Sequence, residues 1–554
     1  MEDHLPVHII LGANEYAQIR TRVPLRVGRR GEPVVEHTCF GWAIMAPGVE
    51  ADLSAGFLAV DAIQDYEMLC SLDVLGLADS PAGDQQEVYR EFREQLSRNT
   101  KEGWYETGLP WKGDHPHLPS NREGSLRRLR TQIAKLRQVG RLQEYDEIIQ
   151  DQLKEGVVEP APSEPVGREY YMPHRAVIKD SAETTKLRVV YDCSARGGKG
   201  LPSLNDCLEP GPALQNKLWD VLVRGRFQSV ALAGDMRKAF LQVRIREGER
   251  DALRFHWLRD LHSTEIQTLR FTRALFGLAP SPFLLGGVVE QHLESWSDQL
   301  PESVDDLISG GPTVSRAKKL KDDAIAIFAD GGFQLHKWHS NAPELERDSQ
   351  EQPAETEDTY AKLQLGSASV EGSKLLGLGW NKAEDTLSVW FPEENVELTK
   401  RGILGKLARI YDPLGLVSPT SLEGKLLYRE ACELKQAWDA PLPDELARKW
   451  RKWESNLPSS VSTRRTLATH RESIEVVELH SFGDASGHGV SAAVYAVVRQ
   501  ASGTTQGLVA AKARLAKQQL TIPRPCSGAY GSKLSRQCTK SLGWLPCDIG
   551  LLLA

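Results

Sequence analysis

The sequence predicts several domains of mixed α/β and α+β structure. Its 554 residues exceed what a single hydrophobic core usually holds, and hydrophobic residues make up 40% of them. Strand-like apolar runs alternate along the chain with stretches in which apolar residues recur at helical spacing. A proline-rich segment at 160–165 is typical of a boundary between domains.

The part before this boundary is predicted to hold short strands and then helices. Runs at 8–13 and 38–44 are rich in β-branched residues and end at turn-forming residues, which predicts strands. Helical spacing predicts helices over 87–98 and within 124–156. The second region is rich in Arg and Lys, and a solvated face is favoured over a nucleic-acid contact by about two to one.

The part after the boundary is predicted to be strand-rich at first and mixed later. The elements predicted in order are a hairpin at 170–178 and 187–191, a strand at 228–233, a helix at 282–296, a flexible polar insertion at 340–367, strands at 376–380 and 387–391, helices at 399–411 and 421–438, and strands within 476–499. After Arg524 the apolar periodicity ends, so residues 525–554 are predicted to be unrelated to what precedes them.

Composition limits the possible classes of function. No apolar run reaches the roughly 18 residues of a membrane helix, and the acidic amino terminus lacks the pattern of an export signal, so a cytoplasmic protein that is not secreted is expected. The eight cysteines lack CxxC spacing, which predicts free thiols. The net charge of −7 argues against a uniformly basic nucleic-acid binder. Residues 168–260 nevertheless carry 17 Lys and Arg against 12 Asp and Glu, enough for a local positive groove.

Three aspartates are the most informative feature. Asp305 and Asp306 are adjacent, and Asp235 lies 70 residues before Asp305, at the end of the predicted strand. Such pairs are common in turns and helix caps, so the pair alone has a functional prior of roughly one in ten. The order of elements raises these odds: a strand ends at Asp235, and the run at 274–283 lies between the acidic elements, an arrangement that places all three carboxylates at neighbouring strand ends. Carboxylates that converge on two Mg²⁺ ions serve phosphoryl transfer, so the trio indicates a polymerase.

Four further stretches are specific enough to indicate a family. They are residues 171–178, 187–195, 332–338 and 411–416. From His8 to Arg524 the chain resembles the polyprotein of a BEL/Pao-type long-terminal-repeat retrotransposon. The resemblance implies a reverse transcriptase with the fingers, palm and thumb of a right-hand polymerase, located in the cytoplasm or in virus-like particles.

The resemblance also implies an order of domains. They are the carboxy-terminal remnant of an aspartic protease at 1–60, a helical connector at 61–166, reverse-transcriptase fingers and palm at 167–392, a helical thumb or connection at 393–470, a partial ribonuclease H-like domain at 475–524 and an unrelated tail at 525–554. No protease activity is expected, because the sequence lacks the Asp-Ser/Thr-Gly turn that supplies the catalytic carboxylate.

The resemblance assigns roles to individual residues. Asp235, Asp305 and Asp306 would hold two Mg²⁺ ions, for which Mn²⁺ could substitute. The residues assigned to the incoming nucleotide are Lys179, Arg188, Phe240, Gly277 and Lys337. Arg188 and Lys179 would contact the triphosphate, and Lys337 would lie near the leaving pyrophosphate.

Phe240 and Gly277 would shape the nucleotide pocket. The ring of Phe240 would leave no room for a 2′-hydroxyl, and Gly277 would let the backbone approach the nucleotide. Without the resemblance, Phe240 has about even odds of being an ordinary core aromatic, and Lys179 and Arg188 would be surface charges on a hairpin.

The chain departs from the family pattern at two places. Asp484 resembles the first carboxylate of a ribonuclease H-like site, but Pro525 and its neighbours stand where the family has the Glu that would be the second ligand, so an inactive fragment is expected. Ser303 stands where the family has an aromatic residue, and residues 300–302 replace an apolar strand. The changes at Ser303 and at residues 300–302 predict low or lost polymerase activity.

Two classes of function follow. The first is an RNA-directed DNA polymerase whose partners are an RNA template, a DNA primer–template duplex and deoxynucleoside triphosphates. The second is a catalytically impaired relic that retains only the fold or nucleic-acid binding. A phosphatase or nuclease is disfavoured because it gives no role to Arg188, Phe240 or Gly277.

Overall fold

The computed structural model describes residues 21, 26–27, 34–38, 41–45, 85–178, 187–296, 308–346, 373–516, 534, 537–539, 542 and 547–551. The chain divides into two compact units, Met1–Gly83 and Asp84–Ala554. In the first unit, β1 (Arg26–Val27), β2 (Val34–Thr38) and β3 (Gly41–Met45) form an antiparallel sheet in that order. The range predicted as one strand at 38–44 is divided between the end of β2 and β3, because Thr38 and Gly41 pair with each other across a hairpin. The run at 8–13 lies outside the described residues.

The second unit begins with helices and short strands. These are α4 (Gln85–Gln95), β4 (Ser97–Arg98), β5 (Tyr105–Thr107), α5 (Arg122–Gln138), α6 (Leu142–Lys154) and β6 (Val158–Pro160). The helical region predicted at 124–156 is two helices, separated at Gly140, whose φ of 67° suits glycine. Leu129, Ile133 and Leu136 of α5 are buried as their spacing predicted, and Arg130 is exposed, consistent with a solvated face.

A hairpin packs on an antiparallel sheet next. The elements are β7 (His174–Ile178), β8 (Leu187–Tyr191), η1 (Asn205–Cys207), η3 (Glu247–Leu253), β11 (Arg254–Leu258) and β12 (Ile266–Phe271), and the sheet has the order β11-β12-β6. The predicted hairpin is therefore present, but it begins at His174 rather than at residue 170. The ring of Tyr191 meets the rings of Phe255 and Phe271 edge-on, with centroids 5.1 and 4.8 Å apart, which fixes the hairpin on the sheet.

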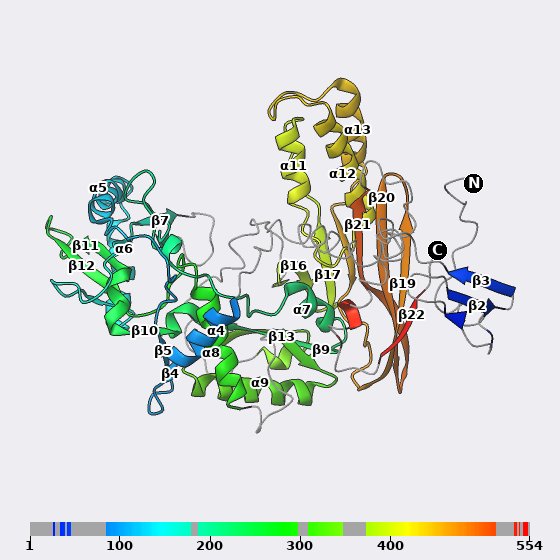
Figure 1. Cartoon of the computed structure of the whole chain (residues 1–554), viewed down its shortest axis with the longest axis horizontal. Helices are drawn as coiled ribbons and strands as arrows, with labels where there is room; N and C mark the ends of the chain where they lie inside the picture. The colour runs from blue at the N-terminus through cyan, green and yellow to red at the C-terminus, as the bar shows by residue number, and fades with distance from the viewer. Residues whose placement is uncertain are drawn as a thin grey trace. The chain divides into compact units, whose positions relative to one another are not determined.

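A second sheet carries the strand that ends near Asp235. Its elements are α7 (Leu218–Gly225), β9 (Val230–Met236), η2 (Ala239–Gln242), β10 (Arg244–Ile245), α8 (Ser281–Glu294), β13 (Ile308–Gly311), α9 (Val314–Asp330), β14 (Leu335–Ser340) and η4 (Pro343–Leu345). Strand β9 lies between β13 and β14 and is antiparallel to both, and α9 packs along all three strands (Figure 1). Strands β13 and β14 therefore run in one direction and form a split βαβ unit with α9.

Two more sheets and three helices complete the second unit. They are β15 (Ser373–Leu375), β16 (Leu378–Asn381), β17 (Thr386–Trp390), α11 (Lys400–Ala408), α12 (Ser418–Glu433), α13 (Asp444–Ser455), β18 (Ser460–Arg464), β19 (Ile474–Ala485), β20 (Gly489–Gln500), β21 (Gly503–Leu515) and β22 (Cys547–Leu551). Strands β15 to β18 form one antiparallel sheet. The other has the order β21-β20-β19-β22 and is antiparallel except for β22, which runs parallel to β19 (Figure 1). Strand β22 comes from the segment that was expected to be unrelated to the rest.

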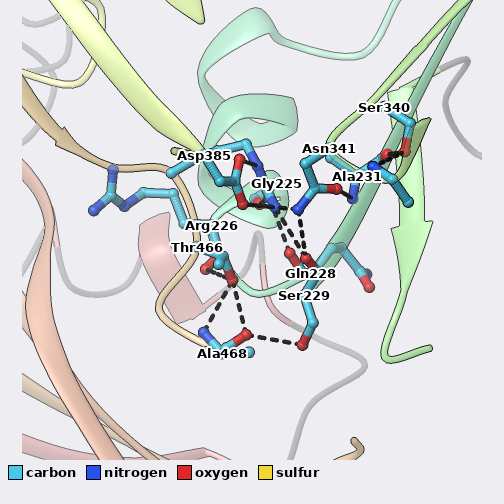
Figure 2. A network of polar contacts seen from close by, with 12 residues as sticks. Gly225, Arg226, Gln228, Ser229, Ala231, Ser340, Asn341, Asp385, Thr466 and Ala468 are labelled. Atoms are coloured by element: carbon cyan, nitrogen blue, oxygen red, sulfur yellow. Dashed lines mark hydrogen bonds and ion pairs between the residues drawn. The ribbon is translucent and has the colours of Figure 1, made fainter. Parts of the chain in front are cut away.

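A buried polar network joins β9 to later parts of the chain (Figure 2). Asn341 follows β14, and its side-chain amide donates to the Ser229 carbonyl and to Asp385, both at 2.9 Å, while its side-chain oxygen accepts from the Ala231 N–H at 2.9 Å. The buried Ser340 hydroxyl donates to the Ala231 carbonyl at 2.6 Å. The first residues of the predicted flexible insertion are thus part of the packed fold, because their polar groups bind the backbone of β9. Residues 347–367 lie outside the described residues.

Among the described helices, none is both long and apolar enough to cross a membrane.

Candidate functional site

Asp235 lies at the end of β9, with its side chain 26% exposed. Val230 and Leu232 of the same strand are buried against α9, which fixes the strand. Asp235 pairs in register with His336 of β14, whose Nε2 atom lies 3.6 Å from the Asp235 carboxylate. Sequence reasoning missed His336, because nothing in the local pattern indicates which strand pairs with β9.

Asp305 and Asp306 lie outside the described residues. The segment that follows them is described, and it pairs with β9: Ile308 lies opposite Ala233. Ile308 is the second residue after Asp306, and Ala233 is the second residue before Asp235. The chain therefore enters β13 beside the end of the strand that carries Asp235.

Phe240 lies in η2, directly after β9, and is only partly buried. Its ring packs edge-on against Phe276, with the two centroids 4.7 Å apart, and Phe276 is 44% exposed. An ordinary core aromatic would be enclosed on all sides. The pair instead forms an apolar surface that solvent can reach, which suits contact with a flat or apolar part of a ligand.

Gly277 directly follows this surface and has a φ of 98°. A Cβ atom at this position would lie 2.6 Å from the Tyr191 carbonyl oxygen at the end of β8. Asn205 fixes the turn, since its amide donates to the Gly277 carbonyl and its side-chain oxygen accepts from the Ala279 N–H, both at 2.9 Å. Only glycine fits here, and Asn205 is a positioning residue that sequence reasoning missed.

The basic residues assigned to the nucleotide lie on separate elements. Arg188 pairs with Val177 in the β7–β8 hairpin, three residues before Tyr191, and is partly buried. Lys337 lies at a register shift of β14 beside His336 and has a φ of 52°. Lys179 is outside the described residues. The close approach of Gly277 to Tyr191 therefore places the hairpin that carries Arg188 beside the turn at Gly277. The pairing of β14 with β9 places Lys337 on a strand next to that of Asp235.

Asp484 lies at the end of β19 and is exposed. One of its carboxylate oxygens accepts the N–H of Ala485 at 2.8 Å. Phe482 on the same strand meets Tyr495 of β20 edge-on, with centroids 5.8 Å apart, and the two side chains are 40% and 44% exposed. Asp484 therefore lies at one end of a face of the sheet that includes aromatic side chains.

Within the described part of the chain, no three His, Cys, Asp or Glu side chains form a group that could hold a metal ion. The donor type at the candidate site still suits Mg²⁺, because the Asp235 carboxylate supplies hard oxygen atoms and is accessible. His336 is a less suitable Mg²⁺ ligand and is better placed to orient the carboxylate.

Residues 399–546 match the family model of the Pao retrotransposon-like RNaseH-like domain. The match covers helices α11 to α13, strands β18 to β21 and Asp484. It supports a relationship of this chain to Pao-type retrotransposons and an RNase H-like fold for its carboxy-terminal part. It begins at residue 399, so it includes helices that were expected to form a thumb or connection. No curated protein matches the chain significantly.

Proposed function

We propose that this chain is a retrotransposon-derived RNA-directed DNA polymerase that adds deoxynucleotides to a primer 3′-hydroxyl. The observation that carries the proposal is the register of β13 on β9. Since Ile308 pairs with Ala233, the Asp305–Asp306 pair directly precedes a strand that runs beside the end of the Asp235 strand. The match to a retrotransposon domain downstream favours nucleic acid as the substrate class.

In this proposal Asp235, Asp305 and Asp306 hold two Mg²⁺ ions, which when bound supply Lewis acidity at the 3′-hydroxyl and at the triphosphate. The protein's own part is to bind and orient. The hydrophobic contacts of Val230 and Leu232 fix β9, and His336, whose Nε2 atom lies 3.6 Å from the Asp235 carboxylate, would help to orient it. A carboxylate oriented in this way would need less reorganisation when charge develops in the transition state.

The surface formed by Phe240 and Phe276 would select the sugar. Because Phe276 supports the Phe240 ring from one side at 4.7 Å, the ring cannot easily turn away from a bound nucleotide. A 2′-hydroxyl would then collide with the ring, so ribonucleotides would be disfavoured. Gly277 and Arg188 would complete the pocket from the side of the β7–β8 hairpin.

Primer extension on an RNA template in the presence of Mg²⁺ tests the proposal. We expect extension by the unchanged chain and a loss of at least about a hundredfold in Asp235→Asn, since a neutral amide cannot replace a carboxylate ligand. Asp260→Asn is a matched control, because Asp260 lies in an exposed turn between β11 and β12 and should extend normally.

The competing proposal is a catalytically impaired relic, which rests on Ser303 and on residues 300–302. Both lie outside the described residues. If the unchanged chain gives no more extension than Asp235→Asn, the polymerase proposal fails and the relic is left. Deoxynucleotide-independent degradation of the template would instead favour a nuclease.

A further inference from the structure

We propose that Arg273, together with Arg244, forms a binding site for a phosphate group of a nucleic-acid backbone. The nucleic-acid source of that phosphate rests on the proposed function. The two arginines form an antiparallel β-bridge, so their side chains are direct cross-strand neighbours. In such pairs the Cβ atoms lie roughly 5 Å apart, and like charges destabilise the fold unless another group offsets them.

Arg244 has compensating contacts of its own. Its guanidinium carbon lies 3.9 Å from the centre of the Trp104 ring, and the carboxylates of Glu102 and Glu106 attract it. The strand pairing brings Arg244 and Glu106 into register. The π face and the two negative charges offset only part of the cost of burial, which lowers the pKa of Arg244.

A third arginine, Arg250, lies close enough to repel Arg273, and it too is paired with carboxylates. Its guanidinium lies 3.3 Å from Glu159 and 3.6 Å from Glu106, and its Nε donates to the Ile245 carbonyl at 2.8 Å. The nearby carboxylates thus act on Arg244 and Arg250.

The Nε atoms of Arg273 and Arg244 are both buried and have no hydrogen-bond partner within the described part of the chain. Arg273 differs from its neighbours in the charges that act on it. Burial is the main cause that lowers the pKa of Arg273, to about 10, and repulsion from Arg244 and Arg250 adds to it. A half-buried cation with cations as its charged neighbours is costly unless an anion joins it.

The chemistry of that anion follows from the donors. Two adjacent guanidinium groups present planar N–H pairs, which match phosphate oxygens. Partial burial strengthens the attraction, because fewer water molecules screen it. A phosphate group bound at the terminal N–H groups would therefore reduce the repulsion between Arg244 and Arg273.

The position of the arginine pair favours a nucleic acid as the source. Arg273 precedes Phe276 by three residues and Arg244 follows Phe240 by four. The two segments are joined by a hydrogen bond of 2.9 Å from the Ala274 N–H to the Val243 carbonyl. The arginines thus lie on the same two segments as the Phe240–Phe276 surface, where a bound primer–template duplex would bring backbone phosphates.

Two measurements test the site without relying on polymerase activity. The first is thermal unfolding with and without inorganic phosphate at constant ionic strength. We expect phosphate to raise the unfolding temperature of the unchanged chain but not of Arg273→Gln. Without phosphate, Arg273→Gln should be at least as stable as the unchanged chain, because it removes a like-charge repulsion. Lower stability of that variant, together with an equal response of both proteins to phosphate, would show a merely structural role and overturn the proposal.

The second measurement is the affinity for an RNA–DNA duplex as a function of salt concentration. Arg273→Gln should bind about three- to tenfold more weakly, with a salt dependence reduced by about one phosphate contact. The control Arg259→Gln removes an exposed arginine, 62% accessible and paired with Glu265, and should leave both quantities unchanged. Phosphate stabilisation with unchanged duplex binding would reject the nucleic acid as the source. Duplex binding through Arg273 by a chain that cannot extend primers would contradict only the proposed function.

Discussion

Two buried histidines show how single residues set the response of the fold to pH. His174 is 5% exposed, and its Nε2–H donates to the His256 carbonyl at 2.9 Å, so its Nδ1 accepts from the Tyr145 hydroxyl at 2.5 Å. His256 is 2% exposed, and its Nδ1 lies 3.2 Å from the Ser125 hydroxyl. Burial lowers the pKa of each histidine to about 4.

Stability should therefore fall as the pH drops from about 6.5 towards 4. In that window the unfolded chain binds protons at His174 and His256 that the folded chain does not bind, so the free energy of unfolding rises with pH by up to about 1.4 kcal/mol per pH unit for each histidine. Denaturant titrations of the unchanged chain and of His174→Gln at several pH values measure this slope. The variant should lose about one histidine's share of it. Equal slopes in both proteins would show that His174 is not neutral in the fold.

At the scale of elements, the turn at Gly277 determines how the β7–β8 hairpin meets the segment after β12. Gly277→Ala should destabilise the fold and displace the turn, because a Cβ atom would lie 2.6 Å from the Tyr191 carbonyl and the φ of 98° is strained for alanine. Gly405→Ala is the control, since Gly405 lies within α11 with no atom near its added Cβ, and it should be neutral or stabilising by up to about 1 kcal/mol.

Thermal unfolding of the two glycine variants provides the measurement. A Gly277→Ala protein as stable as the Gly405→Ala protein would show that the turn can adopt another conformation. It would also remove the argument that the backbone at Gly277 is held for a ligand.

The elements also show what local patterns can and cannot predict. The strand at 228–233, the hairpin and the helix at 282–296 all occur within a few residues of their predicted bounds, because their apolar spacing reports burial directly. The insertion predicted from residue 340 was wrong at its start. Ser340 and Asn341 are polar, but their side chains form hydrogen bonds with the backbone of Ala231 in β9. Polarity alone does not distinguish such residues from residues that are solvated.

At the scale of the whole second unit, Arg465 holds distant segments together. It is 1% exposed, and its guanidinium binds both oxygens of Asp385 at 2.6 Å. Its remaining N–H groups donate to the carbonyls of Gly225, Gln228 and Ser229, so all five donors are used. The next residues continue the junction, and the Leu467 N–H donates to the Arg226 carbonyl at 2.6 Å.

Replacing Arg465 should weaken this junction strongly. Arg465→Gln leaves Asp385, whose side chain is 16% exposed, without its cation. The cost should approach the lower end of the about 3–5 kcal/mol typical of a broken buried pair, and Arg465→Lys should not restore stability because lysine lacks the planar fork. Hydrogen exchange of residues 225–236 and 466–470 should increase together in both variants. The control Arg401→Gln breaks an exposed pair with Asp439 and should change neither stability nor exchange appreciably. Faster exchange in only one of the two segments would show that Arg465 does not couple them.

The family match and the junction concern the same part of the molecule. Arg465 and the residues after it belong to the segment that matches the Pao retrotransposon-like RNaseH-like domain, and they bind the turn that begins β9. The expected inactivity of a ribonuclease H-like site at Asp484 remains a prediction. Degradation of an RNA–DNA hybrid tests it. Mg²⁺-dependent cleavage by the unchanged chain that is lost in Asp484→Asn would contradict the prediction.

The sequence by itself determined the mixed α/β character, most of the elements around β9 and the residue types of the candidate site. These features depend on local spacing and on side-chain chemistry, which a linear pattern records. Only the tertiary structure decided that His336 lies beside Asp235, that Arg273 faces Arg244 and that Arg465 binds the turn before β9. Each of these contacts joins segments that are separated along the chain. Their formation depends on how sheets and helices pack together, which no local pattern specifies.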